Sequence, residues 1–122
     1  MAAVEGYEVI FYDKADGTEP AKDFILSLDK KMRAKMLRTV SLLASNGPDL
    51  REPCSKPLGD GIFELRAKVG SDISRVLYFF MIGRRVILTN GFIKKTQKTP
   101  QAEIERAKRY RADYLGRKEN KQ

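Results

Sequence analysis

Two arginines on neighbouring segments of this chain have the type and spacing for chemistry on a phosphate. In the segment 62–68, every second residue from Glu64 is charged: Glu64, Arg66 and Lys68. Arg75 interrupts the apolar run that follows. Side chains alternate between the two faces of a strand, so Glu64, Arg66 and Lys68 share one face. The next strand brings Arg75 close to them. Several cations around one acid favour a polyanion as counter-charge. The alternative is structural, with Glu64 and Arg75 forming a cross-strand ion pair.

A second group of cations stands directly before an expected helix start at Thr99-Pro100. Lys94, Lys95 and Lys98 fall within five residues of one another. The first amide groups of a helix have no partner inside it, so lysines beside them favour phosphate binding. The alternative is an ordinary solvated loop.

A nucleic acid is the polyanion that this combination of cations favours. In RNA, the 2′-hydroxyl is an internal nucleophile, so an RNA-cleaving enzyme must position it, stabilise charge on the phosphate and transfer protons. The planar arginine fork suits phosphate oxygens, and a lysine serves as acid or base. An aromatic residue in a strand is available for base stacking, although such residues more often belong to the core. The candidate catalytic residues are Arg66, Arg75 and Lys94, and the candidate RNA-binding residues are Lys68, Tyr78, Lys95 and Lys98.

The composition narrows the chemistry further. The net charge of +8 is uneven, because residues 1–60 carry 9 basic and 10 acidic side chains whereas residues 94–122 carry 10 and 4. The chain has no histidine and a single cysteine, Cys54, so we expect neither a zinc site nor an internal disulfide. No apolar stretch approaches the length of a membrane span. We therefore expect a cytoplasmic protein that needs no metal or cofactor.

Hydrophobic periodicity predicts the elements that position these residues. Residues 7–12 are rich in aromatic and β-branched side chains, which predicts a strand. Apolar residues at helical spacing predict two helices, capped by Thr18 and Asp29 and ending at Asn46. Residues 48–60 are expected to form an irregular connection.

Three strands with tight turns follow from Gly61, and a last helix starts after Thr99. The predicted fold is therefore α+β in the order β-α-α-β-β-β-α, with residues 1–122 in one domain. It has an antiparallel sheet, an N-terminal helical hairpin and a C-terminal helix. The packing side of that last helix is Ile104, Ala107, Tyr110 and Tyr114.

Three segments together resemble a known family of toxins. They are Phe63-Glu64-Leu65-Arg66, residues 74–79, and residues 91–100 with the distinctive pattern Phe-x-Lys-Lys-Thr-x-Lys-Thr-Pro. This combination is similar to the phage-derived Gp49-like branch of HigB toxins in the RelE/ParE superfamily. The resemblance covers roughly residues 7–115 and implies a RelE-like fold. Some HigB toxins use histidines in their site, and this chain has none.

The resemblance implies a toxin of a type II toxin-antitoxin system, a metal-independent endoribonuclease that cleaves mRNA in the ribosomal A site and inhibits translation. Its expected partners are that mRNA and a co-expressed helix-turn-helix antitoxin. It also implies functional basic residues on the central strands, where Arg66, Lys68 and Arg75 stand, and at the end of the last strand, where Lys94 and Lys95 stand. Two alternatives remain open, a gyrase-inhibiting ParE-like toxin and a non-catalytic phage-derived RNA-binding protein.

Overall fold

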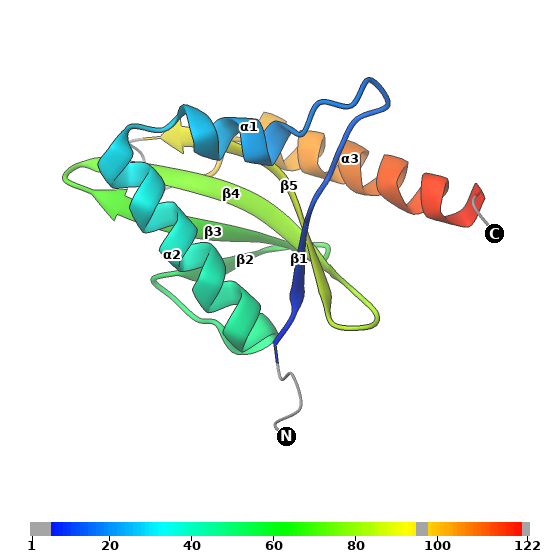
Figure 1. Ribbon diagram of the computed structural model, residues 1–122, viewed down its shortest axis with the longest axis horizontal. Coiled ribbons are helices and arrows are strands. Elements are labelled where there is room, and N and C mark those ends of the chain that lie inside the picture. Colours follow the sequence, from blue (N-terminus) through cyan, green and yellow to red (C-terminus); the bar gives the residue numbers. More distant parts are fainter. Residues whose placement is uncertain (1–5, 95–97, 121–122) are drawn as a thin grey trace.

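A five-stranded sheet forms the centre of the computed structural model. The structure describes residues 6–94 and 98–120, and at residues 94 and 118–120 it describes the backbone alone. The strands lie in the order β1-β5-β4-β3-β2 (Figure 1). The elements are β1 (Glu8–Phe11), α1 (Pro20–Ser27), α2 (Lys30–Asn46), the short 3-10 helix η1 (Gly47–Asp49), β2 (Ser55–Gly59), β3 (Ile62–Val69), β4 (Asp72–Met81), β5 (Arg85–Lys94) and α3 (Gln101–Asn120).

The sheet differs from the predicted antiparallel one in two respects. β1 pairs in parallel with β5, whereas β2, β3, β4 and β5 pair antiparallel in sequence order. The pair of β1 and β5 is distant in sequence, so no tight turn forces its direction. The second difference is β2 itself, which lies in the segment expected to be irregular. Its Pro57 is tolerated because β2 is an edge strand, where one missing amide donor costs no ladder bond.

The caps of the two N-terminal helices were predicted with mixed success. The Asp29 side chain accepts a hydrogen bond from the amide of Met32 at 2.9 Å, which confirms it as the cap of α2. The prediction for Thr18 is wrong. α1 is preceded by Glu19 as N-cap, and the Thr18 hydroxyl instead donates to Asp16 at 2.7 Å. Pro20 fits the first helical position because its missing amide donor has no partner there in any case.

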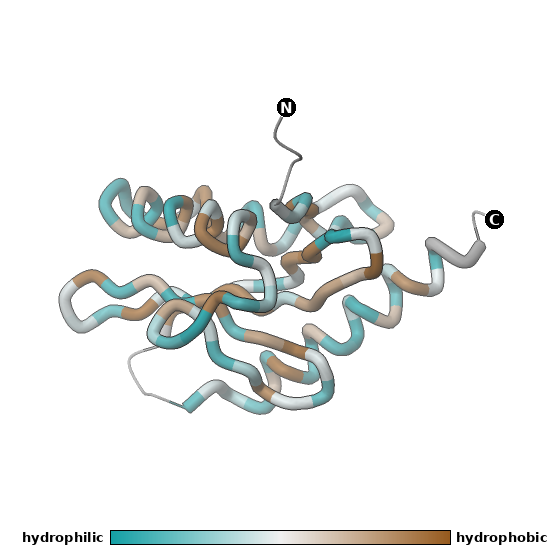
Figure 2. Tube along the Cα trace, turned by 90° about the horizontal axis from the view of Figure 1, so that it is seen from below, coloured by the Kyte–Doolittle hydropathy of each residue, from teal (hydrophilic) through white to brown (hydrophobic). Residues whose placement is uncertain are grey.

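The helices cover the two faces of the sheet. Figure 2 shows the sheet between the α1–α2 hairpin on one side and α3 on the other. Met32, Met36 and Leu43 of α2 are buried in the first layer, as their spacing predicted. Ala107 is buried in the second layer, with Tyr110 and Tyr114 packed beside it, which agrees with the predicted packing side of α3. Within the part of the chain that the structure describes, no helix is both long and apolar enough to cross a membrane.

The close approach of α1 to β5 gives a test of this packing. A Cβ atom at Gly91 would lie 2.3 Å from Cδ2 of Phe24. We predict that Gly91→Ala lowers the free energy of unfolding by about 1–3 kcal/mol, because the ring must shift within a packed layer. The matched control is Gly116→Ala in α3, where the added methyl meets nothing within 4 Å and alanine is the better helix former. Urea denaturation of both variants checks this, and equal stabilities would contradict the described packing.

Candidate functional site

Arg66 and Arg75 lie side by side on the two central strands. In the register of β3 and β4, Arg66 is directly opposite Arg75, and Arg75 is opposite Phe92 of β5. Residues directly opposite one another in an antiparallel pair point to the same face. That face is the one that α3 covers, because Leu77 and Phe79 on the same side of β4 pack in the layer around Ala107.

The carboxylate of Glu64 connects the two arginines. Its Oε2 atom lies 2.5 Å from Nε of Arg66 and 3.8 Å from Nε of Arg75. The Thr99 hydroxyl donates a hydrogen bond to the other oxygen, Oε1. The cross-strand pair of Glu64 with Arg75 therefore exists, but the nearest cation to the carboxylate is Arg66 on its own strand. One carboxylate thus joins β3, β4 and the residue that precedes α3.

These groups are held in a nearly dry environment. The side chains of Glu64 and Arg75 are 0% exposed, and that of Arg66 is 16% exposed. Burial lowers the pKa of Arg75, Glu64 opposes that shift, and Arg66 adds to it. An arginine stays charged under such conditions, so the trio of Glu64, Arg66 and Arg75 carries one net positive charge. A buried carboxylate is tolerated only with such charged and hydrogen-bonding partners.

The burial of Arg75 corrects one expectation from the sequence. The sequence made Arg75 a candidate catalytic residue, which requires access to the substrate, yet Arg75 has no exposed surface. In this conformation it cannot touch a phosphate directly. Arg66 is the arginine of the pair that reaches the surface. We therefore regard Arg75 as a positioning residue that acts through Glu64, and Arg66 as the candidate for direct contact.

Two of the lysines predicted for the site, Lys68 and Lys98, lie at its margin. Lys68 is exposed and borders, with Arg66 and Cys54, an open pocket of about 460 Å³. Lys98 is exposed and directly precedes Thr99, which the bond to Glu64 holds against β3. Lys94 is the last residue of β5, opposite Ile73 in the register. The Lys94 side chain and all of Lys95 lie outside the described residues.

Tyr78 does not fit its predicted role in base stacking. It is 1% exposed and lies on the opposite face of the sheet, in the layer covered by the helical hairpin. Its hydroxyl is 2.5 Å from that of Ser55, and its ring stacks on Phe63 with centroids 5.5 Å apart. Burial raises the pKa of Tyr78, against the opposing effect of the Ser55 hydrogen bond. Neither face of this ring is accessible to a base, so we no longer count Tyr78 among the candidate RNA-binding residues.

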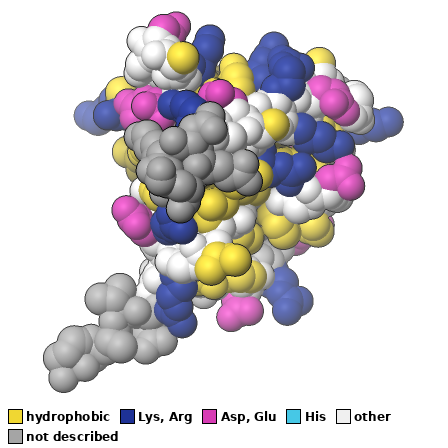
Figure 3. All heavy atoms as spheres, turned by 90° about the vertical axis from the view of Figure 1, so that its right-hand side faces the viewer, with side chains coloured by type: hydrophobic (Ala, Val, Ile, Leu, Met, Phe, Trp, Pro, Cys, Tyr) yellow, Lys and Arg dark blue, Asp and Glu magenta, His cyan; other side chains and the backbone are white. Residues whose placement is uncertain are grey.

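In the described part of α3, three cations form ion pairs with nearby acidic side chains. Lys108 lies 2.7 Å from Asp60, which raises the pKa of Lys108. Arg106 lies 2.9 Å from Glu103, and Arg117 lies 3.1 Å from Asp113. Figure 3, which faces the end of the molecule where α3 ends, shows basic and acidic side chains side by side. The positive charge of the C-terminal segment is therefore less available to a polyanion than its sum suggests.

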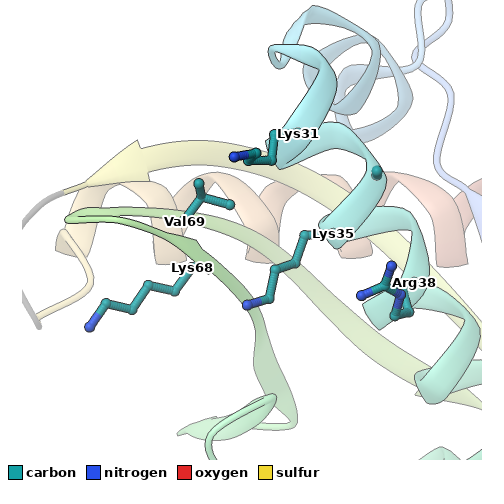
Figure 4. Close-up of a pocket in the computed structure, with 6 residues that line it drawn as sticks. Lys31, Lys35, Arg38, Lys68 and Val69 are labelled. Atoms are coloured by element: carbon teal, nitrogen blue, oxygen red, sulfur yellow. The ribbon is translucent and has the colours of Figure 1, made fainter.

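Sequence reasoning missed three cations of α2. Lys31, Lys35 and Arg38 are exposed and line a pocket together with Lys68 (Figure 4). Their spacing of four and three residues places them on one side of the helix, which is a signal that the sequence contains. It was hidden because charges were summed over residues 1–60, where acids elsewhere cancel them.

The fold and the site define a small α+β protein in which a buried Arg–Glu–Arg network lies next to a basic edge of the sheet. Among the residues that the structure describes, no group of three or more His, Cys, Asp or Glu is placed to hold a metal ion. Residues 23–112 match the family model described as Phage derived protein Gp49-like. The chain belongs to this family, a RelE/HigB-like toxin family, as the sequence resemblance predicted. No curated protein matches the chain.

The buried network predicts a specific pattern of stabilities. We expect Arg75→Met to lower the free energy of unfolding by about 3–5 kcal/mol, because it removes one cation from a carboxylate with no access to water. The double variant Glu64→Gln/Arg75→Met is expected to recover part of that loss, since it leaves no buried unbalanced carboxylate and Arg66 can turn to solvent. Denaturant titrations of the wild type, both single variants and the double variant measure the coupling. Strictly additive effects would show that Glu64 and Arg75 do not interact.

Proposed function

We propose that this protein is the toxin of a type II toxin-antitoxin system and that it cleaves mRNA in the ribosomal A site without a metal ion. The observation that supports this most strongly is the pair of Arg66 and Arg75 about one buried carboxylate, which Thr99 joins to the start of α3 next to the exposed Lys98. Membership in a family of RelE/HigB-like toxins agrees with it. We further propose a helix-turn-helix antitoxin as the neutralising partner and the cytoplasm as the place of action.

The arrangement suits cleavage by the 2′-hydroxyl of RNA. The 2′-oxygen loses its proton to a base and forms a bond to the adjacent phosphorus, while the 5′-oxygen leaves with a proton from an acid. Negative charge increases on the phosphate oxygens during this step, and a guanidinium already in place stabilises it without reorganising. Glu64 fixes Arg66 through Nε, so Arg66 is the group we assign to that charge. Lys68 and Lys94 are our candidates for the proton transfers.

Two other functions predict different behaviour. A ParE-like toxin that inhibits gyrase has no need of a guanidinium fixed by a buried carboxylate, and a non-catalytic RNA-binding protein needs cations only on its surface. The cost of burying Glu64 and Arg75 favours the enzyme, because such networks hold a group in one orientation. Induction in cells separates the three, since stalled replication supports the gyrase inhibitor and unimpaired growth supports the non-catalytic protein.

The test is cleavage of mRNA on programmed ribosomes in a single-turnover assay. We expect Arg66→Ala to lower the rate constant on the order of 100- to 1000-fold, because the group that stabilises the phosphate is lost. Arg66→Lys should retain part of the activity, since it keeps the charge near Glu64 but loses the planar fork. Arg109→Ala removes an exposed arginine of α3 and serves as the charge-matched control. Thermal unfolding of each variant establishes that it is folded. Full activity of a folded Arg66→Ala variant would refute the assignment.

A further inference from the structure

A basic groove runs along the edge of β3, outside the network of Glu64. β2 pairs with β3 only as far as Leu65, so the remaining part of β3 faces α2 without a neighbouring strand between them. Two adjoining pockets lie there, of about 400 Å³ and about 460 Å³, and both are lined by Lys35 and Lys68. Cavities of this size accommodate ligands comparable to a nucleotide or larger. We call the two pockets together the α2–β3 groove.

The lining of the α2–β3 groove is strongly one-sided in charge. It includes five cations and no carboxylate; the cations are Lys31, Lys35, Arg38, Arg66 and Lys68. Among the described residues, none of the ion pairs involves a groove cation other than Arg66. This contrasts with α3, where Arg106, Lys108 and Arg117 are paired with acids. A concentration of cations without acids is unfavourable by itself and attracts a polyanion.

The cations of the groove follow a line. Lys31, Lys35 and Arg38 span about 10 Å along α2, from the rise of about 1.5 Å per residue. Figure 4 shows these three residues along α2 and Lys68 on the neighbouring strand β3, with the Lys68 side chain extending away from the helix. Lys68 and Arg66 then continue the line to the buried Glu64, since both border the second pocket. The groove therefore leads from the outer side of α2 to the guanidinium that we assign to the reaction.

We propose that the α2–β3 groove binds the sugar-phosphate backbone of the single RNA strand that flanks the cleaved bond. This inference rests on the proposed function, because it takes Arg66 as the group that acts on the cleaved phosphate. A positively charged groove that follows the backbone is how single strands are bound without regard to sequence. An acidic protein segment is the competing occupant. The continuity of the groove with Arg66 favours RNA, because a strand bound there passes directly to the site of cleavage.

The test compares two triple variants of equal charge. K31A/K35A/R38A empties one wall of the groove and keeps Arg66 and Lys68. The control K14A/K22A/R109A removes three exposed cations from other parts of the surface. The probe is a fluorescent 2′-O-methyl RNA of about ten nucleotides, within the range of single-strand site sizes, whose blocked nucleophile prevents cleavage. Fluorescence anisotropy gives its dissociation constant at several salt concentrations.

We expect the groove variant to bind the probe on the order of 10- to 100-fold more weakly than the control. The slope of log K against log[salt] should become less steep by about 2, because fewer cations contact phosphates. On programmed ribosomes it should need more protein for half-maximal cleavage. If the wild type does not cleave mRNA and the groove variant still binds the probe more weakly, the proposed function is wrong but RNA binding by the groove is supported. Equal binding by the two triple variants overturns the groove. Unchanged RNA binding with lost inhibition by an acidic antitoxin also overturns it, in favour of the protein segment.

Discussion

The side chain of Glu64 has no exposed surface, so its charge must be balanced inside the protein. The partners that balance it come from three places: Arg66 on the same strand, Arg75 on the next strand and Thr99 before α3. Because these contacts converge on two oxygen atoms, they fix how β3, β4 and the start of α3 meet. The orientation of Arg66 at the surface depends on this arrangement, and so does the position of Lys98 next to Thr99.

The cations of the molecule divide into groups with different surroundings. Arg75 is buried, Arg66 is held at the boundary, and the α3 cations Arg106, Lys108 and Arg117 pair with acids. In the α2–β3 groove, described cations gather without a carboxylate in the lining. Net charge alone does not reveal this division. In our proposal, the boundary arginine stabilises the reacting phosphate and the groove holds the flanking strand, while the paired cations stabilise the fold.

Local patterns predicted the elements well and long-range features poorly. The helix α2 was recognisable from the Asp29 cap, the apolar spacing and the stop at Asn46-Gly47-Pro48, all of which act within a few residues. The parallel pairing of β1 with β5 depends on contacts far apart in sequence and has no local signal. β4 is covered on both faces, so its apolar run does not alternate, and the sequence could not tell the face of Tyr78 from that of Leu77. The burial of Arg75 was missed because it depends on Glu64 and Thr99, which are distant in sequence, coming into contact in the folded protein.

Our central claim is that the Glu64 network supports cleavage of mRNA. Mapping the 5′ ends of cellular mRNA shortly after the intact protein is induced tests that claim most directly, because it observes the broken bond itself. We predict new ends within coding regions, phased with the reading frame and absent when translation is blocked beforehand. An mRNA population without new ends, in cells whose growth nonetheless stops, would contradict it.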